Sequence, residues 1–268
     1  MSDREIALDN EILRGVVGST SHGTAIEGQD DRDEMAVFVE PPDNVCGLAS
    51  VDHYIYRDQP EGVRSQPGDL DLTMYSLRKF CRLATQGNPS VILLLWLPSH
   101  ITKMPVGAEL IAMREAFVSK EAGRRFLGYL VAQKAKLKGE RAHTVNRPEL
   151  VAKYGYDTKF AMHALRLGFE GIELMTDRRL TLPVAEPNLT TLRAVRSGRI
   201  DLAETLRLIE NAEERLQALV EACTWAADVA AINRFMVRAH IQHWQSRHLL
   251  AREWNISPAN LGLVGAAQ

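Results

Sequence analysis

The apolar residues of this 268-residue chain change their spacing near residue 104, and that change limits the folds that the chain can adopt. Before this point, apolar residues alternate with polar ones in short runs between turns rich in Gly, Pro and Asp, a pattern typical of β-strands. After it, Ala, Leu, Glu, Lys and Arg recur at helical spacing. The sequence therefore predicts an α+β fold with two parts: a head at residues 1–104, in which helices back a short mixed sheet, and a C-terminal helical domain at residues 105–268.

The predicted elements follow from these runs and from the residues that interrupt them. Ser76 is a suitable N-cap for the helix that follows the last strand, and Gly87-Asn88-Pro89 ends that helix. The apolar run at residues 91–97 is a buried element, because a bilayer span needs about 20 residues. Strands are predicted at residues 13–18, 33–39, 51–56 and 69–75, and helices at residues 76–86, 105–118, 120–138, 157–175, 201–223 and 227–248.

Charge, cysteine spacing and the first residues narrow the class of protein. The net charge of −2 argues against a protein that coats duplex nucleic acid, since such binding depends on neutralising phosphates. Cys46, Cys81 and Cys223 form no CxxC pair, so the sequence predicts neither a disulfide framework nor a thiolate zinc site. The charged N-terminus lacks the apolar core of a signal peptide. We therefore expect a cytoplasmic protein that does not enter a membrane; its oligomeric state stays open.

Carboxylates stand at the start of two predicted strands. Asp31 and Asp33 are two residues apart, so their side chains project to one face and can bind the same divalent ion. Asp69 and Asp71 open a second alternating run, and either would add a third carboxylate if the two strands are neighbours. Three carboxylates can hold two ions, and ligands that are all oxygen favour Mg²⁺ or Mn²⁺.

A glycine-containing segment precedes these carboxylates. Gly18 adds no side-chain bulk, so the backbone can approach a phosphate closely. Ser19 and Ser21 are candidate phosphate ligands because their hydroxyls can donate hydrogen bonds. His22 can either steady a phosphate or make a hydrogen bond within the loop.

Together these residues resemble the RNA-repair-pathway DNA polymerase β family, a group of bacterial and phage proteins identified as nucleotidyltransferases. The family pattern is G-S-x-x-x-G, then S-D-x-D before an apolar strand, then an Asp ahead of Y-S-L-R-K-F, then G-N-P. This sequence has Gly18-Ser19 with Gly23, Asp31-x-Asp33, Asp71, the motif itself at residues 75–80, and Gly87-Asn88-Pro89. The likeness continues into residues 156–166 and covers about residues 13 to 200. Asp30 and Glu34-Met35-Ala36 depart from the pattern.

The resemblance implies a nucleotidyltransferase head and a helical domain that closes over the nucleotide. It implies that Asp31, Asp33 and Asp71 are the catalytic, metal-binding residues, with Asp71 preferred to Asp69 because it lies four residues before Tyr75. The reaction implied is metal-dependent transfer of a nucleoside monophosphate from an NTP to an acceptor hydroxyl, by analogy an RNA end. The implied nucleotide-binding residues are Gly18, Ser19, Ser21, His22, Lys159, His163 and Arg166.

Other interpretations remain open. The same head would serve a protein-modifying, antitoxin-like adenylyltransferase or a non-catalytic nucleotide-binding module. Lys159, His163 and Arg166 share one helix face, which is either a solvated surface or a phosphate-binding one. Arg234 and His240 loosely match the Arg-x(4–6)-His pattern of HEPN ribonucleases, a spacing that often arises by chance in a helix.

Overall fold

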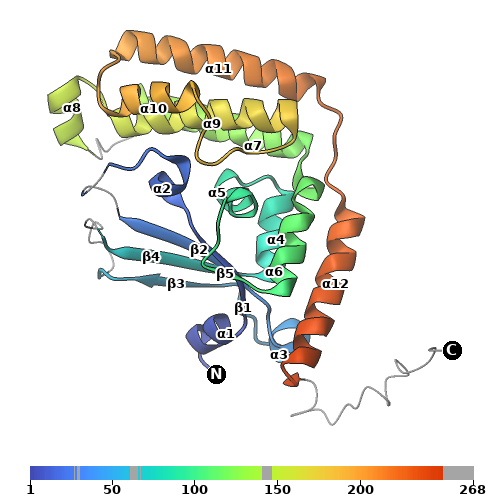
Figure 1. The fold of residues 1–268 in the computed structure, drawn as a ribbon. Helices are drawn as coiled ribbons and strands as arrows, with labels where there is room; N and C mark the ends of the chain where they lie inside the picture. The colour runs from blue at the N-terminus through green and yellow to red at the C-terminus, as the bar shows by residue number, and fades with distance from the viewer. Residues whose placement is uncertain (27, 29–30, 61–65, 67, 141–146, 250–268) are drawn as a thin grey trace.

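The computed structural model describes residues 1–26, 28, 31–60, 66, 68–140 and 147–249, and Figure 1 shows how they are arranged. A sheet forms the centre of the head, and helices of the tail form a layer above it. The strands are β1 (Glu11–Val16), β2 (Arg32–Phe38), β3 (His53–Arg57), β4 (Leu70–Ser76) and β5 (Thr102–Lys103). The helices are α1 (Asp3–Asp9), α2 (Gly18–His22), α3 (Pro42–Cys46), α4 (Leu77–Thr85), α5 (Pro89–Ile92), α6 (Pro105–Ala112), α7 (Lys120–Leu137), α8 (Pro148–Tyr154), α9 (Thr158–Asp177), α10 (Asn188–Arg196), α11 (Leu202–Ala222) and α12 (Val229–Ser246), with 3-10 turns η1 (Leu93–Trp96) and η2 (Arg114–Phe117).

The five strands form one mixed sheet with the order β3-β4-β2-β1-β5. β2 and β4 run parallel, and the other three pairs are antiparallel. Parallel neighbours need a crossover connection, and the chain between them includes α3 and the edge strand β3. The predicted α+β class is therefore confirmed, and the four predicted strands end within two residues of their predicted limits.

The two faces of the sheet pack against different partners. On β4, Leu72 and Met74 point to the face that α1 covers, where they join a small apolar cluster with Phe38. The alternate residues Asp71 and Thr73 point to the opposite face and stay partly exposed. This alternation brings the acidic residues of the strand to the side on which the helical layer lies.

The helical layer is built on α9, which packs against α7, α10 and α11. Gly171 of α9 lets these helices come close, since a Cβ there would lie 2.7 Å from Leu216 of α11 and 3.0 Å from Phe126 of α7. The predicted tail helices are confirmed as α7, α9, α11 and α12. One apolar cluster joins buried residues of this layer to those of the head, so no break in packing marks residue 104. The division into two domains stays a prediction.

The prediction of a single helix over residues 105–118 is wrong. α6 ends at Ala112, and η2 follows, because the chain bends there to place Phe117 in the core, where it is fully buried. The sequence also gave no warning of α1, α2, α3, α8 and α10, since helices of so few turns show little periodicity. Among the described residues, no helix is long and apolar enough to cross a membrane.

α12 returns to the head and is held there by a buried carboxylate. Glu40, which follows β2, is fully buried; its Oε2 lies 3.1 Å from His240 Nε2, and its Oε1 accepts a hydrogen bond of 3.0 Å from Arg78 Nε. Trp244 Nε1 donates to the Glu40 backbone oxygen. Burial alone would raise the pKa of Glu40, but the contact with His240 lowers it below its ordinary value. The carboxylate therefore stays charged and links the end of β2 to α4 and α12.

We expect Glu40→Ala to lower the free energy of unfolding by about 3 kcal/mol, because it leaves the buried ring of His240 without its acceptor and removes the ion pair with Arg78. Urea denaturation followed by circular dichroism measures this. Arg238→Ala is the matched control: it breaks an exposed ion pair of α12 with Glu109 and should cost less than about 1 kcal/mol. Equal losses in the two variants would contradict the assignment.

Candidate active site

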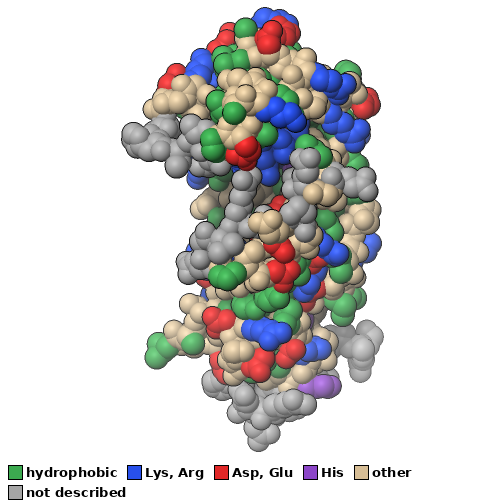
Figure 2. All heavy atoms as spheres, turned by 90° about the vertical axis from the view of Figure 1, so that its left-hand side faces the viewer, with side chains coloured by type: hydrophobic (Ala, Val, Ile, Leu, Met, Phe, Trp, Pro, Cys, Tyr) green, Lys and Arg blue, Asp and Glu red, His purple; other side chains and the backbone are tan. Residues whose placement is uncertain are grey.

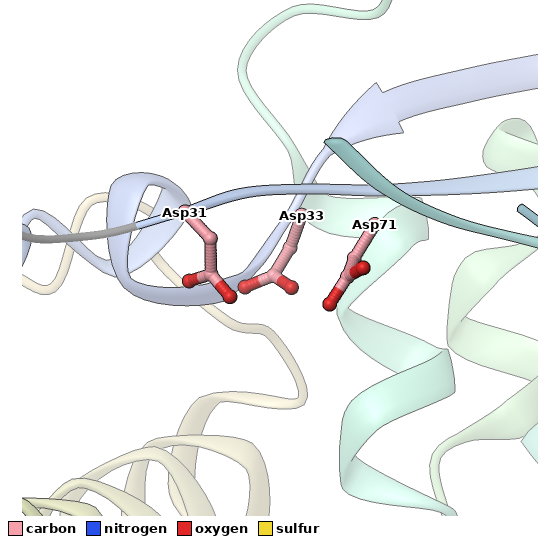
Figure 3. A group of neighbouring side chains, drawn as sticks. All are labelled: Asp31, Asp33 and Asp71. Carbon is pink, nitrogen blue, oxygen red and sulfur yellow. The ribbon is translucent and has the colours of Figure 1, made fainter. Parts of the chain in front are cut away.

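Three carboxylates meet at one end of the parallel strand pair. Asp31 directly precedes β2, Asp33 lies on β2, and Asp71 lies on β4. One oxygen from each can be chosen so that all three lie within 4.8 Å of one another. Figure 3 shows the side chains pointing to the same side of the sheet. Hard divalent cations prefer such ligands, so the trio has the composition and spacing of a metal site.

Strand pairing explains why these acids meet. In the parallel ladder of β2 and β4, Asp33 is the direct partner of Asp71. Asp31 is two residues before Asp33, so it points to the same side. Asp69 lies outside this group: its Oδ2 accepts a 2.6 Å hydrogen bond from the backbone N–H of Gln66 in the exposed turn before β4. Geometry thus groups Asp71, rather than Asp69, with the other two.

Gly18 lies directly against the Asp33 carboxylate. Its φ is +66°, and a Cβ at this position would lie 2.0 Å from Asp33 Oδ2. The neighbouring Val17 N–H donates a 2.9 Å hydrogen bond to the Asp33 backbone oxygen. Only glycine fits the backbone angle and the contact together, so Gly18 keeps Asp33 in its place within the trio.

Arg166 of the helical layer faces the same cleft. The cleft has a volume of about 350 Å³, and its lining includes Gly18, Asp33, Asp71, His22 and Arg166. It therefore joins the carboxylates of the sheet to a guanidinium of α9.

Glu170 holds Arg166 and His22 in position. Arg166 Nη1 donates to Glu170 Oε2 at 2.8 Å and lies 2.8 Å from His22 Nε2, while His22 Nδ1 lies 2.7 Å from Glu170 Oε1. Burial lowers the pKa of His22, so the ring is neutral, with Nδ1–H toward Glu170 and Nε2 accepting from Arg166. Burial alone would raise the pKa of Glu170, but Arg166 and His22 bring it down to about 2.

Lys159 and His163 belong to the same basic region but do not line the cleft described above. Burial lowers the pKa of His163 well below its ordinary value, and Arg166, Lys159 and Arg147 lower it further. Burial and the neighbouring positive charges together therefore keep His163 neutral. In Figure 2, Lys and Arg side chains gather in the upper, helical part, and Asp and Glu side chains gather below them.

The two serines of α2 are placed differently from the trio. Ser21 donates its hydroxyl to the Gly18 backbone oxygen at 2.9 Å and lines a separate pocket with His100 and Pro183. Ser19 stands in the first turn of α2, next to Gly18. Their assignment as phosphate ligands stays a prediction.

Two residues of the site were missed in the sequence. Glu170 stands one helical turn after Arg166, so the i,i+4 spacing could have identified it. Glu173, farther along the same helix, pairs with Arg179 at 3.6 Å. Arg57 ends strand β3, whereas Asp71 lies on β4. Only the tertiary structure places Arg57 Nε 3.8 Å from Asp71 Oδ1.

The Arg234 and His240 pattern forms no common site. His240 is buried and contacts Glu40, whereas Arg234 is exposed and lines a groove on the outer side of α12 with Val237 and Ile241. The two side chains therefore lie on different faces of the helix.

An enzyme that transfers a nucleotide must bind a polyphosphate beside carboxylates, and this cleft offers groups for both tasks. The family comparison defines the class of protein: a nucleotidyltransferase. The chain belongs to the RNA repair pathway DNA polymerase beta family, whose model matches residues 7–247. The family resemblance inferred from the motifs is confirmed.

Several solved structures resemble the chain, and the likeness of one of them is weak. It is the crystal structure of a nucleotidyltransferase-like protein from Exiguobacterium sibiricum 255-15, with 11% identity and a TM-score of 0.29. The match covers 97% of this chain and 84% of that one. At this TM-score it carries no weight for function. No curated protein matches the chain.

We expect Gly18→Ala to lower nucleotidyl transfer about 100-fold or more, because the new methyl group would displace the Asp33 carboxylate. Gly28→Ala is the matched control: Gly28 also has a positive φ, of +70°, but a Cβ there meets nothing within 4 Å. Both variants carry similar backbone strain, of about 1 kcal/mol. If pyrophosphate release falls equally in both, the contact with Asp33 is unimportant.

The buried Glu170 predicts a loss of stability in acid. Its pKa is about 2 in the folded protein and near 4.5 when exposed, so its ionised form stabilises the fold above pH 4.5. This contribution is lost as the pH falls from 4.5 toward 2. We expect the difference in unfolding free energy between the wild type and Glu170→Gln to shrink over this range. A difference that stays constant from pH 6 to pH 2.5 would contradict the stabilising role of the ionised Glu170.

Proposed function

We propose that this nucleotidyltransferase moves a nucleoside monophosphate from an NTP to a hydroxyl of an RNA end and needs a divalent metal ion. The observation that carries the proposal is the meeting of Asp31, Asp33 and Asp71 within 4.8 Å, in a cleft that Arg166 also lines. In the reaction, the acceptor oxygen forms a bond to the α-phosphorus, and the bond from that phosphorus to the pyrophosphate breaks.

The three acids fit Mg²⁺ or Mn²⁺ as ligands, since each offers a carboxylate oxygen. When bound, such an ion supplies positive charge that neutralises the triphosphate and lowers the pKa of the acceptor hydroxyl. Asp31 and Asp33 would hold the ion on the triphosphate side. Asp71 would complete the second ligand set and could accept the proton of the acceptor hydroxyl at its carboxylate.

Arg166 supports this assignment from the other side of the cleft. Its guanidinium can donate to phosphate oxygens, and its contact with Glu170 restricts its orientation. His22, neutral and fixed by the same contacts, shapes the cleft beside Gly18. Lys159 lies in the same basic region, and we assign its charge to longer-range attraction of the nucleotide, whereas the neutral His163 would act through a hydrogen bond to the nucleotide.

RNA as the acceptor is supported by the RNA repair pathway that gives the family its description. The test is incubation with each labelled NTP, with Mg²⁺ or Mn²⁺, and with an RNA pool, followed by mapping of the label. Label at RNA ends supports the proposal. Label on protein would identify a protein-modifying enzyme, and nucleotide binding with no pyrophosphate released would identify a non-catalytic module.

We expect Asp31→Asn, Asp33→Asn and Asp71→Ala each to lower transfer about 100-fold or more, because each removes one metal-binding carboxylate. For Asp71→Ala, equilibrium dialysis should still detect bound NTP, since the ligands on the triphosphate side remain. Stability should not fall in any of the three, because clustered carboxylates without metal repel one another. Full activity of Asp33→Asn would overturn the assignment.

Asp69→Ala is the matched control for Asp71→Ala. Asp69 is two residues away and carries the same charge, but its Oδ2 accepts a hydrogen bond from the Gln66 backbone N–H in the exposed turn. We expect a loss of stability of about 1 kcal/mol and activity close to that of the wild type. If Asp69→Ala were the inactive variant, Asp69 would be the third carboxylate.

A further inference from the structure

The active-site cleft continues beyond Asp71 along strands β3 and β4. Besides the groups already described, its lining includes Ile55, Arg57, Thr73 and Tyr75. In the antiparallel ladder, Arg57 is the partner of Asp71 and Ile55 is the partner of Thr73, so these four side chains share one face of the sheet. The metal-binding residues thus lie at one end of a longer surface.

This surface carries positive charge and aromatic rings, with no role so far in the proposed chemistry. Arg57 is 58% exposed and lies 3.8 Å from Asp71 Oδ1 at the near end. At the far end, the Lys79 ammonium lies 5.9 Å from the centre of the Tyr75 ring and 3.0 Å from His53 Nδ1. Burial raises the pKa of Tyr75, and the interaction with Tyr129 of α7, which is 38% exposed, raises it further.

The distance between the two ends exceeds the length of one nucleotide. Arg57 and His53 are four residues apart on β3, which corresponds to roughly 13 Å at the rise of a strand. A triphosphate held between Arg166 and the acids occupies the other end of the cleft. The groups from Arg57 to Lys79 are therefore available to the second substrate.

Cations at intervals with aromatic faces between them are the features that bind unpaired nucleotides. Arg and Lys contact successive phosphates, while bases stack on the rings whatever their sequence. A duplex would need a wide basic surface and would hide its base faces, whereas this surface carries the cations Arg57 and Lys79 and includes the exposed apolar Ile55. Its chemistry therefore fits a single strand.

We propose that the β3–β4 surface formed by Arg57, Tyr75 and Lys79 binds the unpaired terminal nucleotides of the acceptor strand and directs its hydroxyl toward Asp71. Arg57 contacts the phosphate nearest to the reacting end, Tyr75 stacks against a base, and Lys79 contacts a phosphate farther along. This inference rests on the proposed transfer to a nucleic-acid end, because it assigns the acceptor side of that same cleft.

Binding can be measured without turnover, by fluorescence anisotropy of the full chain with a short labelled oligoribonucleotide and no NTP. We expect Tyr75→Ala to weaken binding about tenfold or more, because stacking on the ring is lost, and Tyr75→Phe to bind like the wild type. Arg57→Ala and Lys79→Glu should weaken binding and reduce its dependence on salt, since each removes a phosphate contact. Because Lys79 is a surface cation, Lys79→Glu tests the surface even if Tyr75→Ala fails to fold.

Arg207→Ala is the control with the same loss of charge, since Arg207 forms an exposed ion pair with Glu204 on α11, away from the sheet. It should leave affinity unchanged. An oligoribonucleotide and an oligodeoxyribonucleotide of the same sequence separate an RNA acceptor from a DNA one. Wild-type affinity in all three surface variants, or a duplex that binds as tightly as its single strand, would overturn the inference.

Kinetics separate this inference from the proposed function. In a transfer assay the surface variants should raise the KM for the acceptor strand and leave the KM for NTP unchanged. If the protein binds single strands through these residues but transfers no nucleotide, the proposed function fails while the surface stands. If it transfers nucleotides and the KM for the strand does not change, or if the label goes to protein, the surface assignment is wrong.

Discussion

The parallel pairing of β2 and β4 is the constraint on which the rest of the site depends. It places Asp33 opposite Asp71, and the period of two along β2 brings Asp31 to the same side. A shift of one residue in this pairing would turn Asp71 toward the face that packs on α1, where Leu72 and Met74 are buried. Burial of those two residues therefore fixes the register, and the register in turn fixes the acidic group.

Charge is arranged in layers around the cleft. The sheet supplies carboxylates, and α9 supplies the guanidinium of Arg166. Left alone, a buried guanidinium would be costly, but Glu170 lies 2.8 Å from it on the following turn and neutral His22 fills the space between α2 and α9. The same contacts that stabilise the interior thus hold a cation facing the acids. The contacts of Arg166 with Glu170 and His22 thus contribute both to stability and to the proposed binding of phosphate.

Parts of this arrangement were predictable from local sequence. The alternation of apolar and polar residues predicted the strands, and Ser76 predicted the start of α4. The motif around Asp31, Asp33 and Asp71 indicated the family. Each of these features depends on residues close together in the chain. The short helix α2 was not predictable, since five residues show no helical period. Nor was the partner of His240, because Glu40 is 200 residues away in the chain and belongs to a different element.

By itself, the sequence determined the α+β class, the family and the acids available for a metal, because periodicity and motif spacing are local properties. Only the tertiary structure decided which residues meet across the cleft. It grouped Asp71 rather than Asp69 with the other acids, paired Arg166 with Glu170, and brought Arg57 to the rim of the site. The physical reason is that strand register and helix packing are set by burial of apolar side chains elsewhere, so the positions of polar groups follow from contacts that the sequence alone does not show.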